Sequence, residues 1–281
     1  MKIITEKDAA AVVCKRKNNS FKGTYGRVLT VGGTENFGGA ITMSTSAAVH
    51  AGAGLVTCAT DKENLPALHT IVPEAMFINY FDKVALSNAV AQSDVTVVGP
   101  GLGTSLRSRE IFQLVLNNIA PDHYVLIDGS AITLLAGDQD LEKLVPKQNV
   151  IYTPHQMEWQ RLSGIKIPEQ DLEKSLAAQK DIGGTIVLKK FHTCILHEDG
   201  SQSELHCGGP YMATGGMGDT LTGIIAAFAA QFKDQPFNQV IDAAVYTHSA
   251  IADWLSAKRY VVLPSNIISH LQEFMHDLSI K

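Results

Sequence analysis

The sequence predicts an α/β fold in which a mostly parallel sheet is flanked by helices. Short β-branched runs recur along the chain and are apolar on both faces, which suits strands buried inside a parallel sheet. Helical segments separate these runs and supply the crossovers that parallel strands require. The 281 residues are 45% hydrophobic and 18% charged, which is ordinary for a globular protein with a substantial core. We therefore expect one layered domain spanning residues 1–281.

Six apolar segments are expected to form the parallel strands. They are Arg27–Val31, Leu55–Thr60, Asp94–Val98, Tyr124–Asp128, Val150–Thr153 and Thr185–Lys189. A hairpin is expected over Thr193–Cys207, because its centre contains Asp199-Gly200, a strong turn signal.

The helices that can be bounded from the pattern lie at the two ends of the chain. Gly39–Gly52 is crowded with Ala, Ser and Thr, which permit close packing against the sheet or a partner. The last third is expected to be helical over Asp219–Phe232, over Asn238–Ala257 and from near Pro264 to near Ile280.

Composition disfavours several classes of protein. A formal net charge of −5 without a basic stripe argues against nucleic-acid binding. The four cysteines form no Cys-x-x-Cys pair, so neither a cysteine zinc site nor a disulfide framework is expected. The N-terminus lacks a secretory pattern, and no apolar run approaches the roughly 18 residues of a membrane span. We expect a cytoplasmic protein with no membrane partner.

The segment Ala213–Thr220 carries the strongest chemical signal. Its glycines, Gly215, Gly216 and Gly218, allow backbone N–H groups to face an anion, and the positive end of the following helix adds to the attraction. Asp219 beside this cradle is suited to accept a hydroxyl proton during phosphoryl transfer. The structural alternative is that Asp219 is only a helix N-cap and that the glycines form a tight turn.

Two other strand ends are rich in glycine. Gly32–Ala40 would let a ligand approach the backbone, although such turns also carry glycine for steric reasons. Val98–Gly103, with Asp128 further on, invites a dinucleotide-binding interpretation, but its third glycine comes one residue early. No Gly-Lys-Ser or Gly-Lys-Thr occurs, which excludes a Walker-type phosphate loop.

His155 and Glu158 follow a predicted strand and are three residues apart. They would share one face of a helix that begins there, where His155 could bind a ligand and Glu158 a hydrated Mg²⁺. The alternative is a pair of exposed residues at a helix start. The histidines His50, His69 and His248 are expected to be packed or solvated side chains.

Together these segments resemble the ribokinase-like superfamily, and within it the ADP- or ATP-dependent NAD(P)H-hydrate dehydratases. The matching motifs, in chain order, are Lys22–Gly26, Gly32-Gly33 to Gly39-Ala40, Ala51–Val56, Gly99–Gly103, Thr153-Pro154-His155 with Glu158, and Met212–Asp219. The resemblance covers about residues 20 to 255 and implies a three-layer fold.

Two departures from the family pattern stand out. Asp128-Gly129-Ser130 lacks the second carboxylate that the family usually has there, so no role is carried over for that group. Lys190 replaces the glycine that usually follows the lysine of the nucleotide loop, so the backbone path of that loop is expected to differ.

The resemblance implies a division of the site into two parts. Ala40, Gly103, His155 and Asp219 would line the hydrated-cofactor site. The residues expected against the nucleotide and its phosphates are Lys189, Lys190, Phe191, His192, Thr193, Gly215, Gly216, Met217 and Gly218.

The implied reaction is phosphorylation of a ring hydroxyl of NADH-hydrate or NADPH-hydrate, followed by loss of phosphate. ADP is favoured over ATP as donor, because bacterial members of the family generally use ADP and the chain begins without an organelle-targeting extension. Mg²⁺ near Glu158 is the implied cofactor, and a homo-oligomer, a tetramer by the resemblance, is the implied assembly. The alternatives are a vitamin or sugar kinase on the same fold and a non-catalytic nucleotide sensor.

Overall fold

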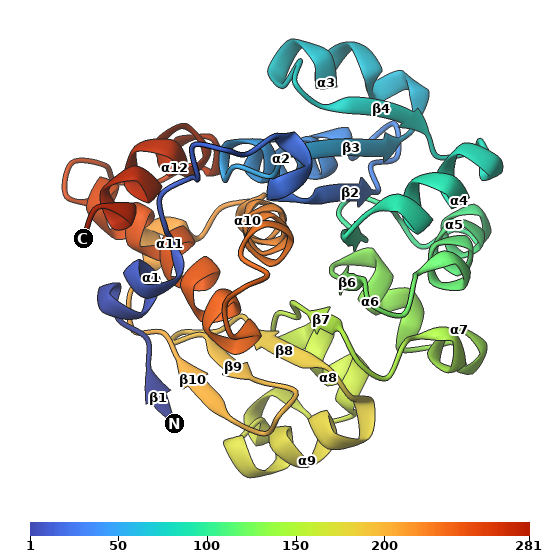
Figure 1. The fold of residues 1–281 in the computed structure, drawn as a ribbon. Coiled ribbons are helices and arrows are strands. Elements are labelled where there is room, and N and C mark those ends of the chain that lie inside the picture. The colour runs from blue at the N-terminus through green and yellow to red at the C-terminus, as the bar shows by residue number, and fades with distance from the viewer.

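The computed structural model describes residues 1–281 and builds them around a ten-stranded sheet (Figure 1). The strands are β1 (Lys2–Ile3), β2 (Arg27–Val31), β3 (Leu55–Thr60), β4 (Met76–Asn79), β5 (Val95–Val98), β6 (Tyr124–Ile127), β7 (Val150–Tyr152), β8 (Thr185–Leu188), β9 (Cys194–Leu196) and β10 (Gln202–Glu204). Their order across the sheet is β1-β10-β9-β8-β7-β6-β5-β2-β3-β4.

The helices connect these strands and follow the last of them. They are α1 (Glu6–Val12), α2 (Gly38–His50), α3 (Leu65–Ile71), α4 (Lys83–Gln92), α5 (Leu106–Asn118), α6 (Ser130–Leu135), α7 (Gln139–Leu144), α8 (Gln156–Ser163), α9 (Leu172–Ile182), α10 (Met217–Gln231), α11 (Phe237–Ser256) and α12 (Pro264–Ser279). No helix combines the length and the apolar character that crossing a bilayer would require.

The predicted parallel sheet is confirmed. Strands β4, β3, β2, β5, β6, β7 and β8 run parallel to their neighbours, whereas β9 is antiparallel to both β8 and β10. All six expected strands are present, and the expected hairpin is formed by β9 and β10. The sequence pattern missed β1, which has only two residues, both exposed, and β4, whose four residues are exposed or only partly buried.

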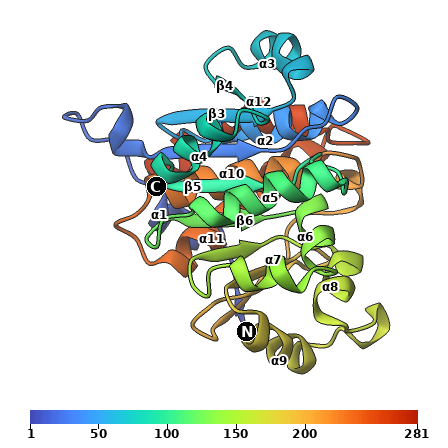
Figure 2. The same ribbon diagram turned by 90° about the vertical axis from the view of Figure 1, so that its right-hand side faces the viewer.

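Helices cover both faces of the sheet, so the expected layering is also confirmed. Figures 1 and 2 show α10 and α11, with α1 and α12, on the side around which the sheet curves, and α5 to α8 on the other side. Each face has its own cluster of buried apolar residues. The stripe expected on α11 is buried, at Ile241, Ala244, His248, Ile251 and Leu255.

The strand order reverses between β2 and β5. From β2 the chain proceeds outward to β3 and β4, and from β5 it proceeds the other way to β6, β7 and β8. In open α/β sheets, ligands commonly bind beyond the carboxyl ends of the strands at such a switch point. Gly32-Gly33 and Gly99–Gly103 are the two loops that follow β2 and β5, so the glycine-rich segments of the sequence lie at the switch point.

Small side chains allow α2 and α10 to pack closely, as the composition of the first segment predicted. A Cβ on Gly223 would lie 2.0 Å from the carbonyl oxygen of Ser44, and the Ser44 and Thr222 hydroxyls are 2.9 Å apart. The glycine in α10 therefore fixes the distance between these two helices.

We predict that Gly223→Ala destabilises the protein, although alanine favours helices. The methyl group would meet the α2 backbone, and overpacking of this kind costs about 1–3 kcal/mol. Gly39→Ala in α2 is the matched control, since a Cβ there meets nothing within 4 Å; it should leave stability unchanged or raise it by up to about 1 kcal/mol. Urea unfolding measures both variants, and equal stability of the two would contradict the packing argument.

Candidate active site

The carboxyl ends of three parallel strands bring Asp128, Thr153 and Lys189 together. Each residue directly follows a strand, β6, β7 and β8 respectively. Each of these strands ends one residue earlier than the sequence predicted. The three residues therefore belong to the loops after the strands and not to the hydrogen-bonded sheet. A parallel bridge between His155 and Lys189 prolongs the contact between the β7 and β8 loops.

Asp128 and Lys189 form a buried ion pair. The Lys189 Nζ donates to Asp128 Oδ1 over 2.8 Å, and the Thr153 hydroxyl donates to the same oxygen over 2.7 Å. The Asp128 side chain is only 4% exposed. Burial acts to lower the pKa of Lys189, but the negative charges of Asp128, Glu158 and Asp219 outweigh it and raise that pKa above its ordinary value. Lys189 is therefore a fixed cation.

Asp219 lies in the first turn of α10, within the electrostatic reach of this pair. Burial, and after it the negative charge of Asp128, raise its pKa to about 6, although the positive charge of Lys189 opposes the shift. The N-cap of α10 is Gly216, so the alternative in which Asp219 itself is the cap is wrong. A carboxylate with this pKa is a stronger base than an ordinary aspartate and is still mostly ionised at neutral pH.

The glycines before Asp219 have separate structural reasons. Gly216 has φ of +92°, and a Cβ there would lie 2.5 Å from the Met43 side chain. At Gly218 a Cβ would lie 3.0 Å from Lys189 Nζ. A side chain at Gly218 would thus occupy the space between the start of α10 and the Lys189 ammonium group, which is where an anion would find both a cation and free backbone N–H groups.

His155 and Glu158 lock the start of α8. The His155 Nδ1 accepts from the N–H groups of Met157 and Glu158 over 3.1 and 3.3 Å, and Glu158 Oε2 accepts from the His155 N–H over 2.8 Å. The alternative interpretation, a pair of exposed helix-start residues, is wrong for Glu158, which is 6% exposed. Its carboxylate can be buried because the His155 backbone N–H takes the place of the water that would otherwise hydrogen-bond to it.

The acidic groups fit a hydrated divalent cation better than a directly bound one. Asp128, Glu158 and Asp219 all act on the single ammonium group of Lys189, which leaves an excess of negative charge. One Glu158 oxygen already accepts a hydrogen bond. Mg²⁺ retains most of its waters and needs few carboxylates, so contact through water suits this arrangement.

The loops after β2 and β5 are hydrogen-bonded to each other at the switch point of the sheet. Gly33 N–H donates to the Pro100 carbonyl over 2.9 Å, and Thr34 N–H donates to that of Gly101 over 2.8 Å. Gly33 and Gly101 both have positive φ, of 70° and 63°. Ala40 lies in the first turn of α2 immediately beside this double loop.

Ser130 shows what this chain has in place of the missing second carboxylate. Its hydroxyl accepts a hydrogen bond from the N–H of Gly103 over 3.1 Å. The preceding Gly129 has φ of +53° and ψ of −118°, which only glycine adopts without strain. The Asp-Gly-Ser turn thus attaches α6 to the glycine-rich loop after β5, a role that the sequence did not reveal.

The expected nucleotide segment, Lys189–Thr193, connects β8 to β9. Lys189 points into the site, whereas Phe191 is 80% exposed and stacks on His192. Thr193 continues the hairpin by accepting from Leu205 N–H over 2.9 Å. The structure thus unites Lys189 with Asp219 and Gly218 but directs Phe191 and His192 outward, and the nucleotide contacts of the segment stay a prediction.

His248 lies beneath the glycine cradle and was expected only to be packed or solvated. It is buried, its Nε2 has no partner, and a hydrogen bond joins it to the Met217 backbone. Burial lowers its pKa to about 4, so it is neutral at physiological pH. Helical periodicity places His248 on the buried stripe, but no signal in the sequence connects it to α10.

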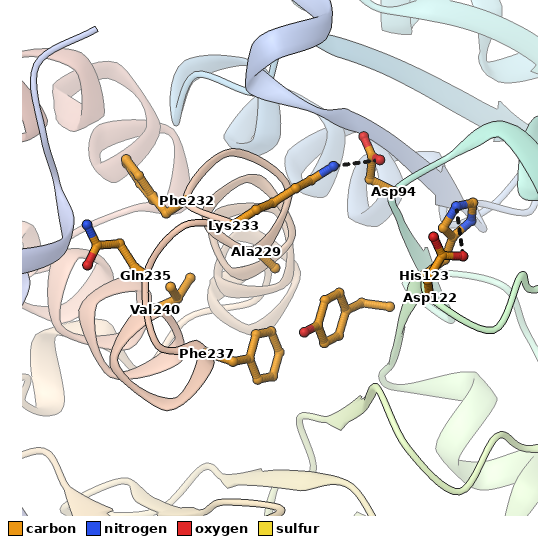
Figure 3. Close-up of a pocket in the computed structure, with 10 residues that line it drawn as sticks. Asp94, Asp122, His123, Ala229, Phe232, Lys233, Gln235, Phe237 and Val240 are labelled. Atoms are coloured by element: carbon orange, nitrogen blue, oxygen red, sulfur yellow. Dashed lines mark hydrogen bonds and ion pairs between the residues drawn. The ribbon is translucent and has the colours of Figure 1, made fainter. Parts of the chain in front are cut away.

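Two hollows of the surface lie away from this site. Figure 3 shows one of about 280 Å³, lined by Asp94, His123 and Phe237 among others. Asp94 precedes β5 and Tyr124 begins β6, so the hollow is at the amino ends of the strands. A larger one of about 760 Å³ includes Tyr25 and Ala53, which precede β2 and β3. Both are on the edge opposite Asp219.

Comparison with known proteins agrees with this arrangement. The family model described as NAD(P)H-hydrate dehydratase matches residues 28–273. The chain belongs to the NAD(P)H-hydrate dehydratase family. It is 45% identical to the ADP-dependent (S)-NAD(P)H-hydrate dehydratase of Lactiplantibacillus plantarum, over 99% of this chain and 98% of the relative.

Solved structures show the same fold. A ribokinase-like superfamily protein from Enterococcus faecalis has a TM-score of 0.95 and 43% identity, covering 100% of this chain and 97% of that one. The ADP/ATP-dependent NAD(P)H-hydrate dehydratase of Bacillus subtilis, crystallised with ATP and Mg²⁺, has a TM-score of 0.84 and 25% identity, covering 99% and 98%. The predicted ribokinase-like fold is confirmed.

We predict that Asp219→Asn stabilises the protein at high pH. Because the pKa of Asp219 is raised from 3.8 to about 6, its neutral form is favoured in the folded state, and ionisation removes stability as pH rises from about 4 to above 6. At pH 8 the variant should be more stable by about 1–3 kcal/mol, at roughly 1.4 kcal/mol per pKa unit, and the difference should vanish near pH 4.

Urea unfolding at several pH values measures this effect. Asp234→Asn is the control, since the Asp234 side chain is 92% exposed and its removal should give no such pH dependence. Parallel stability profiles for the parent and Asp219→Asn would mean that Asp219 is not buried as an ionised group.

Proposed function

We propose that this protein dehydrates (S)-NADH-hydrate and (S)-NADPH-hydrate with ADP as phosphoryl donor, and so restores the dihydronicotinamide ring. The observation that carries the proposal is the position of Asp219, a buried carboxylate with a raised pKa beside Gly218 and Lys189. Its relatives are named for this reaction.

Asp219 would act as the general base. The hydrate carries a hydroxyl on the nicotinamide ring, and hydroxide is a poor leaving group. Removal of the hydroxyl proton by Asp219 lets the oxygen attack the terminal phosphorus of the donor, which leaves as AMP when the donor is ADP. The pKa of about 6 suits a base that must be ionised before it acts near neutral pH.

The start of α10 would stabilise the charge that develops on the transferred phosphoryl group. The N–H groups of Gly215 to Gly218 precede or open the helix, and the helix dipole adds to their attraction for an anion. Lys189 supplies a positive charge 3.0 Å from the position of a Cβ on Gly218. His248, whose pKa is lowered to about 4, lies against the Met217 backbone as a neutral side chain, so the positive charge near α10 comes from Lys189.

Elimination completes the reaction. The phosphorylated ring oxygen leaves as phosphate when the lone pair of the ring nitrogen expels it, and loss of a ring proton restores the dihydronicotinamide. Ala40, Gly103 and His155 are proposed to line the hydrate site. The contact of Ala40 with the loop after β5 that contains Gly101 and Gly103 supports this proposal.

The nucleotide is proposed to lie against Lys189–Thr193 and Gly218, with its phosphates directed toward α10. A hydrated Mg²⁺ between Glu158 and the donor phosphates would screen their negative charge. Glu158 suits this role because it is buried beside Lys189 and Asp219 and would contact the cation through water.

A cytoplasmic, single-domain enzyme that assembles into a homo-oligomer is part of the same proposal. All four cysteines are free thiols, which suits a reducing compartment. Light scattering coupled to gel filtration measures the assembly, for which the resemblance suggests a tetramer.

A vitamin or sugar kinase and a nucleotide sensor are the competing functions. Incubation with hydrated NADH, Mg²⁺ and ADP distinguishes the three by the absorbance of restored NADH. The dehydratase produces NADH and phosphate, a kinase leaves the hydrate unchanged and phosphorylates another hydroxyl compound, and a sensor binds the nucleotide without turnover.

We predict that Asp219→Asn lowers kcat by about 10²–10⁴-fold, the usual contribution of a general base, while nucleotide binding is retained. Asp234→Asn, on the exposed surface, should match the parent. Steady-state assays of NADH formation and calorimetric titration with ADP measure the two properties. A rate within a few-fold of the parent would reassign Asp219 to a structural role.

We predict a preference for ADP over ATP of at least about tenfold in kcat/KM, equivalent to about 1.4 kcal/mol of transition-state stabilisation. The names of the closely similar relatives support ADP, whereas the Bacillus subtilis relative is named for both donors. Assays with each nucleotide, purified free of the other, measure the ratio. A preference for ATP would overturn the donor and leave the dehydration intact.

A further inference from the structure

Three potential metal ligands converge at the outer edge of the sheet, apart from the Asp128–Lys189 pair. His192 lies in the β8–β9 connection, Glu204 ends β10, and His206 follows two residues later. One ligand atom from each lies within 4.8 Å of the others. The Glu204 Oε2 and His206 Nε2 atoms are 2.7 Å apart.

The local backbone explains how the three side chains meet. Leu205 is buried and donates its N–H to the Thr193 carbonyl, which continues the β9–β10 ladder. Residues on either side of a strand position point to the same face, so Glu204 and His206 project together away from the core. The His206 and Glu204 side chains keep 44% and 23% of their surface exposed.

His192 is brought to this pair by an unusual backbone conformation. Its φ is +57°, a left-handed value that is uncommon for residues other than glycine. The ring then stacks on His206 with centroids 4.3 Å apart and an interplanar angle of 15°. Phe191 covers the other face of His192, with centroids 4.1 Å apart. This packing limits the imidazole to the neighbourhood of Glu204 and His206.

We propose that His192, Glu204 and His206 form a binding site for a borderline divalent metal ion, Zn²⁺ in the first instance. Two imidazole nitrogens and one carboxylate oxygen are typical Zn²⁺ ligands, and the exposed side leaves a fourth position for water. The hard ion Mg²⁺ prefers oxygen ligands, so this site is distinct in chemistry from the one near Glu158. The spacing of the cysteines in the sequence gave no sign of the proposed Zn²⁺ site, because none of its three ligands is a cysteine.

Modest side-chain rotations complete the coordination sphere. Ligands about 2.0–2.2 Å from a tetrahedral ion are about 3.3–3.6 Å from one another. Glu204 and His206 therefore separate by less than about 1 Å from their present contact, while the His192 ring tilts out of its stack to direct a nitrogen inward. All three side chains are at the surface, and no core residue has to move.

Metal binding is tested on the full-length protein after removal of metal with a chelator. Calorimetric titration with Zn²⁺ should show one ion per chain, and Co²⁺ should give the visible absorption of a tetrahedral complex. His192→Ala and His206→Ala should each weaken Zn²⁺ binding by more than about tenfold, since even the loss of an outer-shell partner commonly costs 10–100-fold. His69→Ala, which removes an exposed histidine on α3, should bind like the parent.

The same titrations contain the results that would overturn the site. Absence of stoichiometric binding to the parent would do so, as would affinity unchanged in both histidine variants. Binding lost in Asp128→Asn but retained in His206→Ala would assign the ion to the buried acidic cluster instead. Circular dichroism verifies that each variant is folded, and no readout depends on catalytic activity.

Discussion

A single buried ion pair, between Asp128 and Lys189, joins the parts of the chain on which the site depends. It connects the end of β6 to the end of β8, and Thr153 from the intervening β7 donates to the same Asp128 oxygen. Removing one partner of a buried pair leaves the other charge uncompensated, which commonly costs about 3–5 kcal/mol. The interaction therefore fixes the loops of three neighbouring strands against each other.

The electrostatics of the candidate base follow from this pair. Asp219 lies near the negative charge of Asp128 and the positive charge of Lys189. Burial raises the pKa of Asp219 by more than the positive charge of Lys189 lowers it. Without Asp128, the charge of Lys189 would make the pKa of Asp219 lower than it is. Without Lys189, the charge of Asp128 would make it higher. The pair leaves a base of intermediate strength that still has a fixed cation nearby for an incoming phosphate.

Most of the sheet was predictable because strands buried on both faces have continuous apolar sequences, as in β2, β5 and β6. The strands at the two edges of the sheet were missed because β1 has only two residues and β4 is short and only partly buried. The glycines before Asp219 predicted an anion site, and the structure places Gly218 beside the Lys189 ammonium group. The fold was therefore accessible from the sequence, whereas the site stays a prediction.

Contacts between segments that are distant in the chain could not be predicted from the sequence. The sequence showed that Ser130 replaces a carboxylate, but its bond to Gly103 depends on the conformation of Gly129. The sequence left open whether Glu158 is an exposed helix-start residue, and its burial depends on a hydrogen bond from the His155 backbone that no spacing rule requires. His248 likewise meets Met217 only because α11 packs beside α10.

The central position of α10 affects how the chain folds during synthesis. The strands of the sheet are all made before residue 217, yet α10 to α12 supply most of the apolar cluster that covers its concave face. Until these helices leave the ribosome, that face of the nascent sheet has only α1 and α2 to shield it from water. Exposed apolar surface of this kind favours aggregation. Dependence on chaperones should therefore be greatest before residues 217–279 have been translated, and these residues also include Asp219 of the candidate site.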